Sequence, residues 1–191
     1  MLVTLVGDDA TEAAARLAER LAERAPPRVR LTKDDVTSFE DGIGRTAVIF
    51  GHGGPMGLGP TRGSALLTAE WLAQRFTGGR VFAFACATLP VEDRPQSLGQ
   101  RAVDGCVQEF VGFDGTVASP NVAALSPAQR EAVHDAALAM VEAFLTGEGD
   151  ERSLEKVGRD AVDSIEDSLR NLFELGTLLD RLHLRVAVTR K

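Results

Sequence analysis

His52 and Cys86 are the two residues of this sequence whose types and surroundings best suit chemistry. His52 follows the apolar run 46–50, and Cys86 follows the apolar run 81–85. An imidazole can hold or donate a proton near neutral pH, and a thiol becomes a strong nucleophile when it loses its proton. A histidine beside a cysteine can act as the general base that activates the thiol as a nucleophile.

The two apolar runs predict buried strands that bring these side chains together. In an open parallel sheet, ligands bind just beyond the carboxyl ends of the strands, where His52 and Cys86 would both lie. Residues 64–76 between them carry a helical apolar pattern that ends at Gly78 and Gly79. This helix would supply the crossover between the two strands.

The remaining patterns predict an α/β fold with a mainly parallel sheet. Asp9 is expected to cap the first helix, with Glu12 in the capping box, and Ser126 and Pro127 to open a late helix. Residues 51–60, rich in glycine and proline, predict a shaped loop. Further strands are expected at 2–6, 28–31 (an edge strand), 109–113 and 182–188, and further helices at 98–105 and 154–172.

Composition narrows the class of protein. The chain has 191 residues and a formal net charge of −7, so no attraction for nucleic acid is implied. No apolar run is long enough to span a membrane and the start lacks a cleavable leader, which predicts a cytoplasmic protein. The spacing of its cysteines and histidines predicts no metal site and no cofactor. A single domain over residues 1–191 accounts for the whole chain.

The sequences around the two strand ends resemble those of one peptidase family. Gly51-His52-Gly53 and Ala85-Cys86-Ala87-Thr88 are similar to the histidine and cysteine motifs of the caspase-like (clan CD) cysteine peptidases, in their CHAT and gingipain-like bacterial branch. The resemblance covers about residues 2–161. It implies a caspase-like three-layer sandwich, in which helices flank a mainly parallel, roughly six-stranded sheet.

The resemblance also implies roles for individual residues. Cys86 would attack the carbonyl carbon of a peptide bond, and His52 would act as general acid and base. The backbone N–H groups of Gly53 and Cys86 would form the oxyanion hole. Relatives act on protein or peptide substrates, often as bacterial signalling or defence effectors, and a partner protein or sensor would activate this chain in trans.

Substrate preference is the least determined part of the resemblance. Relatives that cut after basic residues often carry an acidic residue two positions before the cysteine, where this chain has Phe84. Asp8, Asp9 and Asp114 lie at or beyond predicted strand ends and could bind a basic side chain, whereas Arg62 would favour an acidic one.

Two other functions remain open. The chain could be a catalytically silent caspase-like domain that binds or scaffolds, or an unrelated α/β domain that binds a small anionic ligand at residues 51–59. Taken alone, Cys86 could be a small buried residue and His52 a turn residue. Cys106 is expected in the core, and His134 and His183 on solvated or capping positions.

Overall fold

The computed structural model describes residues 1–40, 42–89, 96–113, 127–147, 156–157 and 184–188. Its main sheet has the strand order β2-β1-β3-β6-β7-β8. The first five strands in this order run parallel, and β8 pairs antiparallel with β7. The strands are β1 (Leu2–Thr4), β2 (Arg30–Thr32), β3 (Thr46–Phe50), β6 (Arg80–Phe84), β7 (Glu109–Phe113) and β8 (Leu184–Val188).

This architecture confirms the prediction of an α/β fold with a mainly parallel sheet. The parallel part holds five strands and not roughly six, because the last strand returns in the opposite direction. β2 lies at the edge of the sheet, as its polar sequence predicts.

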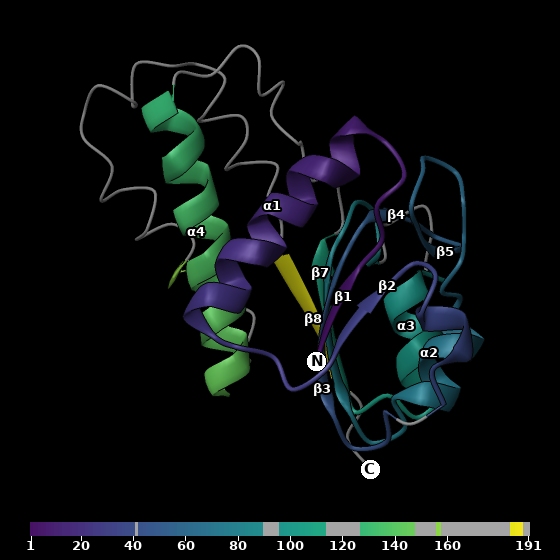
Figure 1. Cartoon of the computed structure of the whole chain (residues 1–191). Coiled ribbons are helices and arrows are strands. Elements are labelled where there is room, and N and C mark those ends of the chain that lie inside the picture. Colours follow the sequence, from purple (N-terminus) through teal and green to yellow (C-terminus); the bar gives the residue numbers. More distant parts are fainter. Residues whose placement is uncertain (41, 90–95, 114–126, 148–155, 158–183, 189–191) are drawn as a thin grey trace.

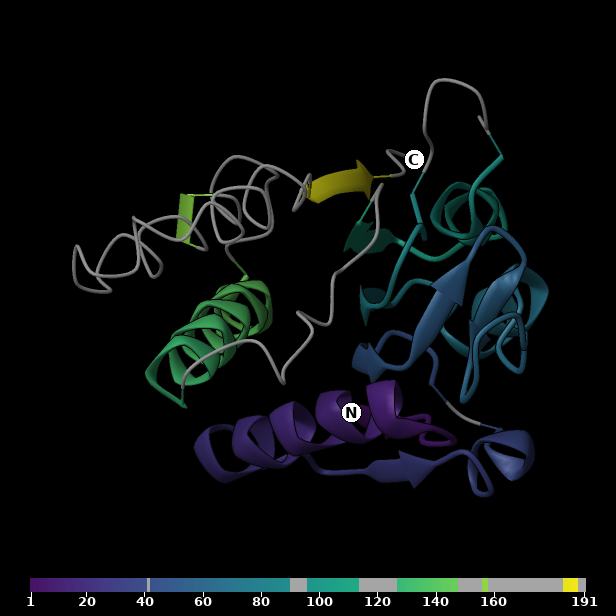
Figure 2. The same cartoon turned by 90° about the horizontal axis from the view of Figure 1, so that it is seen from above.

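Helices cover both faces of the sheet (Figures 1 and 2). On one face α1 (Asp9–Arg24) and α4 (Pro127–Thr146) pack together, with Leu17, Phe82 and Phe144 in the core between helices and sheet. On the other face α2 (Ala69–Arg75) and α3 (Leu98–Asp104) cover a second core. The sheet is therefore buried on both sides, as its apolar strands require.

The first helix begins one residue earlier than predicted. Asp8 is the N-cap, because its backbone is extended (φ −154°, ψ 175°) and its carboxylate accepts a hydrogen bond from the Thr11 backbone N–H at 3.1 Å. The Thr11 hydroxyl in turn accepts from the Asp8 backbone N–H at 3.0 Å. The expected cap Asp9 is instead the first helical residue, and Thr11 takes the place expected for Glu12.

α2 is shorter than the helical pattern at 64–76 predicts, because Leu66 and Leu67 bond to Leu58 of the strand Gly57–Gly59 instead of joining the helix. Thr68 and Ser97 cap α2 and α3 through their side-chain oxygens. Gly78, after α2, has a positive φ of 67°, which glycine adopts without strain. In α4 one face is buried, formed by Ala137, Met140, Val141 and Phe144. The predicted helix at 154–172 lies almost wholly outside the described residues.

Cys106 does not lie in the core. It is exposed and has a positive φ of 87°, because the chain turns sharply after α3 and its carbonyl accepts a hydrogen bond from Gly78. In the described part of the chain, no helix is long and apolar enough to cross a membrane.

Candidate active site

The strands that precede His52 and Cys86 are direct neighbours in the sheet. β3 and β6 pair in parallel through their last residues, with Phe50 opposite Phe84. His52 and Cys86 each follow their strand by the same two positions. Both residues therefore lie at the carboxyl edge of the sheet, where the sequence predicts them.

Gly53 lies directly against the backbone of Cys86. A Cβ atom built on Gly53 would be 2.2 Å from the Cys86 carbonyl oxygen and 2.9 Å from the Cys86 amide nitrogen. Only a residue without a side chain fits at this position. The approach brings the segment that carries His52 into contact with Cys86, which is half-buried.

The segment after β3, for which a shaped loop is predicted, forms a short hairpin. β4 (His52–Gly54) pairs antiparallel with β5 (Gly57–Gly59), and His52 lies opposite Gly59. Gly57 and Gly59 pack so closely on Leu67 and Ser64 that a Cβ atom would clash with either neighbour. Close packing thus requires glycine at these two positions.

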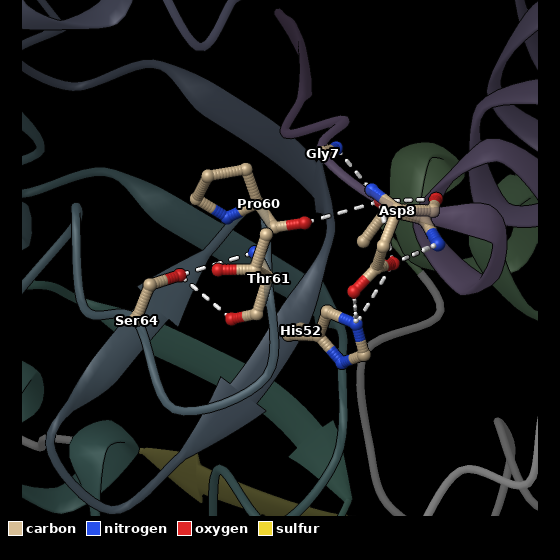
Figure 3. Close-up of polar contacts among 7 residues, drawn as sticks. Gly7, Asp8, His52, Pro60, Thr61 and Ser64 are labelled. Carbon is tan, nitrogen blue, oxygen red and sulfur yellow. Dashed lines mark hydrogen bonds and ion pairs between the residues drawn. The ribbon is translucent and has the colours of Figure 1, made fainter.

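His52 contacts the carboxylate of Asp8. Its Nε2 atom lies 2.8 Å from Oδ2 and 3.1 Å from Oδ1 of Asp8. Figure 3 shows the imidazole with one nitrogen turned toward this carboxylate and the other turned away. The two side chains are 21% and 36% exposed, respectively, so the pair is open to solvent on one side.

The environment of Asp8 favours its ionised form. The pKa of Asp8 lies below its ordinary value, chiefly because its carboxylate accepts a hydrogen bond from the backbone N–H of Thr11. Burial opposes this as the second-largest effect, and the His52 ring and then the Thr11 hydroxyl lower the pKa further. An ionised carboxylate only accepts hydrogen bonds, so Nε2 of His52 must carry the proton. In the neutral imidazole this leaves Nδ1 as the nitrogen that can accept one.

Thr11 links this pair to the far end of the hairpin. Its side chain is buried, and its hydroxyl oxygen accepts from the backbone N–H of Gly7 at 2.9 Å. The same hydroxyl lies 3.1 Å from the carbonyl oxygen of Pro60, which directly follows β5 (the Pro60 segment is seen in Figure 3). The turn after β1 and the turn after β5 are thereby held together around His52.

The residues after Cys86 are also firmly placed. Ala87 has a positive φ of 48°, which is unusual for a residue with a side chain. Thr88 is fully buried, and its backbone N–H donates to the Phe113 carbonyl at 2.9 Å while its hydroxyl accepts from the Phe113 N–H at 3.2 Å. These bonds fix the turn that carries Cys86 to the end of β7.

The residues predicted to select the substrate differ in their burial and in the elements that carry them. Phe84 is half-buried, and its ring lies 5.5 Å from the ring centroids of both Phe50 and Phe113. Asp9 and Arg62 are exposed, Asp9 at the start of α1 and Arg62 in the turn after Pro60. Asp114 lies outside the described residues.

The contact between Asp8 and His52 is a feature that the sequence did not predict. The sequence predicts Asp8 as a substrate-binding carboxylate, and in the structure this carboxylate contacts His52 and the Thr11 backbone N–H. A signal existed: Asp8 follows the first strand, as His52 follows the third. The contact became visible only once β1 was found beside β3, with Thr4 opposite Phe50.

A separate cavity of about 630 Å³ lies at the opposite end of the sheet. Its walls come from the start of β1, the end of α1 and the start of β3, so it is remote from His52 and Cys86. It is lined by Met1, Leu2, Leu21, Ala25, Pro26, Pro27, Arg28, Val29, Arg45, Thr46, Val48 and Leu145. Among the residues with a described position, no cluster of side chains is suited to hold a metal ion.

No protein-family model matches the chain, and no curated protein matches it.

Proposed function

We propose that this chain is a caspase-like cysteine endopeptidase, in which Cys86 is the nucleophile, His52 the general acid and base, and Asp8 the residue that orients His52. The observation that supports this most is the contact between Gly53 and the Cys86 backbone, because it joins two predicted catalytic segments that are distant in sequence. The pairing of His52 with an ionised Asp8 adds a reason for the ring to present Nδ1 as its base.

The first half of the proposed reaction acylates the enzyme. Nδ1 of His52 takes the proton of the Cys86 thiol, and the thiolate attacks the carbonyl carbon of the peptide bond. The new C–S bond yields a tetrahedral oxyanion, which the backbone N–H groups of Gly53 and Cys86 stabilise. When the C–N bond breaks, His52 gives its proton to the departing amine, and a thioester remains on Cys86.

The second half releases the acid product. A water molecule attacks the thioester carbonyl while His52 accepts its proton. The C–S bond then breaks, the product leaves as a carboxylic acid, and Cys86 is again a thiolate beside protonated His52. Asp8 stays ionised throughout and stabilises the imidazolium that forms in each half.

An electrophilic peptide probe tests this function directly. Labelling of the protein should disappear in Cys86→Ala and fall sharply in His52→Ala. Cys106→Ala is the matched control, since Cys106 is the more exposed thiol and lies outside the site. Labelling that persists in Cys86→Ala would refute the proposal. Absence of labelling with every candidate activating protein would favour a catalytically silent, scaffolding domain.

A fluorogenic panel with arginine, lysine, aspartate or asparagine at the cleavage position identifies the preference. Occupation of Asp8 by His52 leaves Asp9 as the described acidic candidate for a basic side chain, with Arg62 the candidate for an acidic one. Cleavage after arginine or lysine that is lost in Asp9→Asn would assign the first preference. Cleavage only after aspartate, lost in Arg62→Ala, would assign the second.

Small-ligand binding is a second candidate function, favoured by the cavity at the opposite end of the sheet. Its walls are largely apolar and include the guanidinium-bearing residues Arg28 and Arg45, a combination that suits an amphipathic anion. The fluorescent anion 8-anilinonaphthalene-1-sulfonate should bind to the wild-type protein and lose affinity in Ala25→Trp, which fills the cavity. Ala10→Trp, at the exposed start of α1, is the control. Equal affinity of all three proteins would exclude this site.

A further inference from the structure

The two segments that carry His52 and Cys86 are anchored differently. The Cys86 turn is bonded to β7 through Thr88 and Phe113, and the carbonyl of Thr88 also accepts from the backbone N–H of Gly99 in α3, at 2.8 Å. The Cys86 turn is therefore fixed both to the sheet and to the first turn of α3.

The hairpin β4–β5 that begins at His52 is attached mainly through its second strand and its tip. It forms a separate two-stranded sheet, and a hairpin of this size is at most marginally stable alone. Its second strand packs on Leu67 through a backbone bridge at Leu58. Its tip, Pro55 and Met56, projects toward solvent, and Met56 is 66% exposed.

Arg101 connects the tip of this hairpin to α3. Its Nη2 atom donates a hydrogen bond to the carbonyl oxygen of Pro55 at 2.6 Å. The Nε atom of Arg101 is buried and has no hydrogen-bond partner among the described residues. Burying an unsatisfied N–H of a charged group is costly, so packing alone would favour an apolar side chain here.

The charge of Arg101 is balanced in part by α2. The pKa of Glu70 is lowered, first by a hydrogen bond from its own backbone N–H, then by the Thr68 hydroxyl, with a smaller contribution from the charge of Arg101. The positive charge of Arg101 therefore acts on Glu70 in the first turn of α2 while its Nη2 atom bonds to the hairpin tip.

We propose that Arg101 is a positioning residue that holds His52 and Gly53 against Cys86. The same helix, α3, contacts the Cys86 turn through Gly99 and the His52 hairpin through Arg101. Both the Cys86 turn and the His52 hairpin are thereby attached to α3. Without the Arg101 bond, the tip of the hairpin loses its attachment to α3, and the imidazole spends less time beside the thiol. This inference rests on the proposed pairing of His52 with Cys86.

The reactivity of Cys86 toward iodoacetamide measures this positioning without a peptide substrate. All proteins carry Cys106→Ala, so that Cys86 is the thiol observed. In the wild-type background, His52 should lower the pH at which Cys86 reacts, and His52→Ala should return the profile to that of an ordinary thiol, with a pKa of about 8.5. Arg101→Met keeps the apolar stem but removes the donor, and should shift the profile in the same direction, with alkylation at pH 7 about fivefold to tenfold slower.

Two further variants separate positioning from folding. Arg101→Lys keeps a donor that can reach a carbonyl and should recover part of the wild-type rate. Arg75→Met is the matched control, because Arg75 in α2 also has a buried Nε without a described partner but does not bond to the hairpin. Its profile should equal that of the wild-type background. Thermal unfolding of each variant checks that the fold is retained.

The outcomes distinguish this inference from the proposed function. A profile of Arg101→Met that equals the wild-type profile, while His52→Ala differs from both, would overturn the role of Arg101 and leave the dyad intact. Equal profiles for wild type and His52→Ala would overturn the dyad and this inference together. If Arg101→Met does not fold, Arg101→Lys decides the question. Its rate should lie between those of the wild-type background and His52→Ala, and a rate equal to the wild-type rate would refute the role of Arg101.

Discussion

Nε2 of His52 lies 2.8 Å from Oδ2 of Asp8, although the two residues are 44 positions apart in the sequence. The same carboxylate caps α1 through the Thr11 backbone N–H. One side chain therefore fixes the start of a helix and the orientation of the candidate general base. These two roles can be separated experimentally, because they depend on different properties of the carboxylate.

Asp8→Asn should reduce peptidase activity while leaving α1 capped. Asparagine caps helices as well as aspartate does, but it carries no charge to stabilise the imidazolium of His52. We expect kcat to fall on the order of 100-fold, with little change in KM. Asp9→Asn, at the neighbouring exposed position, should leave kcat on a substrate without a basic cleavage residue unchanged. Equal kcat values for Asp8→Asn and wild type would contradict the role of Asp8.

The free energy of unfolding should depend on pH through Asp8. Because the pKa of Asp8 in the folded chain lies below the ordinary value of 3.8, the folded state resists its protonation. The stabilisation is complete above about pH 5 and is lost as pH falls through 3.8 toward the lowered folded value. The stability difference between wild type and Asp8→Asn, from urea denaturation, should therefore shrink below about pH 5.

Asp35 provides the control for this pH dependence. Its pKa is also lowered, by hydrogen bonds from the Thr32 side chain and then the Thr32 backbone, and its carboxylate bonds to Thr32 rather than to His52. Asp35→Asn should show a pH trend of the same sign without any change in kcat. A stability difference for Asp8→Asn that is constant with pH would argue against the lowered pKa of Asp8.

Thr11→Val should destabilise the fold by about 1–3 kcal/mol. The substitution keeps the shape of a buried side chain but leaves the Gly7 N–H and the Pro60 carbonyl without their hydroxyl partner. Thr77→Val is the control, since the hydroxyl of Thr77 is exposed and bonds only to the Ala73 carbonyl in the described structure. Urea denaturation of both variants measures the difference, and a loss for Thr11→Val no larger than that for Thr77→Val would contradict the prediction.

Gly53→Ala and Gly54→Ala should differ strongly although they are neighbours. A Cβ atom at Gly53 would meet the Cys86 carbonyl oxygen at 2.2 Å, whereas one at Gly54 has no neighbour within 4 Å. Gly53→Ala should cost about 1–3 kcal/mol of stability and abolish labelling by the peptide probe. Gly54→Ala should retain both. Similar labelling of the two variants would show that the hairpin does not lie against Cys86.

The sequence predicted the elements whose signals are local. The strands at 46–50 and 109–113 are confirmed, because uninterrupted apolar runs are typical of buried strands. α3 (Leu98–Asp104) matches the predicted helix at 98–105 closely, since helix ends depend on residues within one turn, here the caps Ser97 and Gly105. The meeting of His52 and Cys86 at one edge followed from strand ends alone, given a parallel sheet.

Other features depended on contacts between segments that are distant in sequence. Asp8 became the partner of His52 because β1 pairs directly with β3, and no local pattern determines which strands are neighbours. The glycines at 57 and 59 formed a strand because the backbone at Leu67 and Ser64 packs against them, which their composition alone does not reveal.

The sequence by itself determined the α/β class, the residues with reactive side chains and the edge of the sheet that carries them. These follow from hydrophobic periodicity and residue chemistry, which depend only on residues that are close together in the sequence. The tertiary structure decided which carboxylate orients His52, that Gly53 supports Cys86, and that Arg101 attaches the hairpin to α3. Such contacts join segments that are brought together only by the pairing of strands and the packing of helices. No pattern within a single stretch of the chain therefore predicts them.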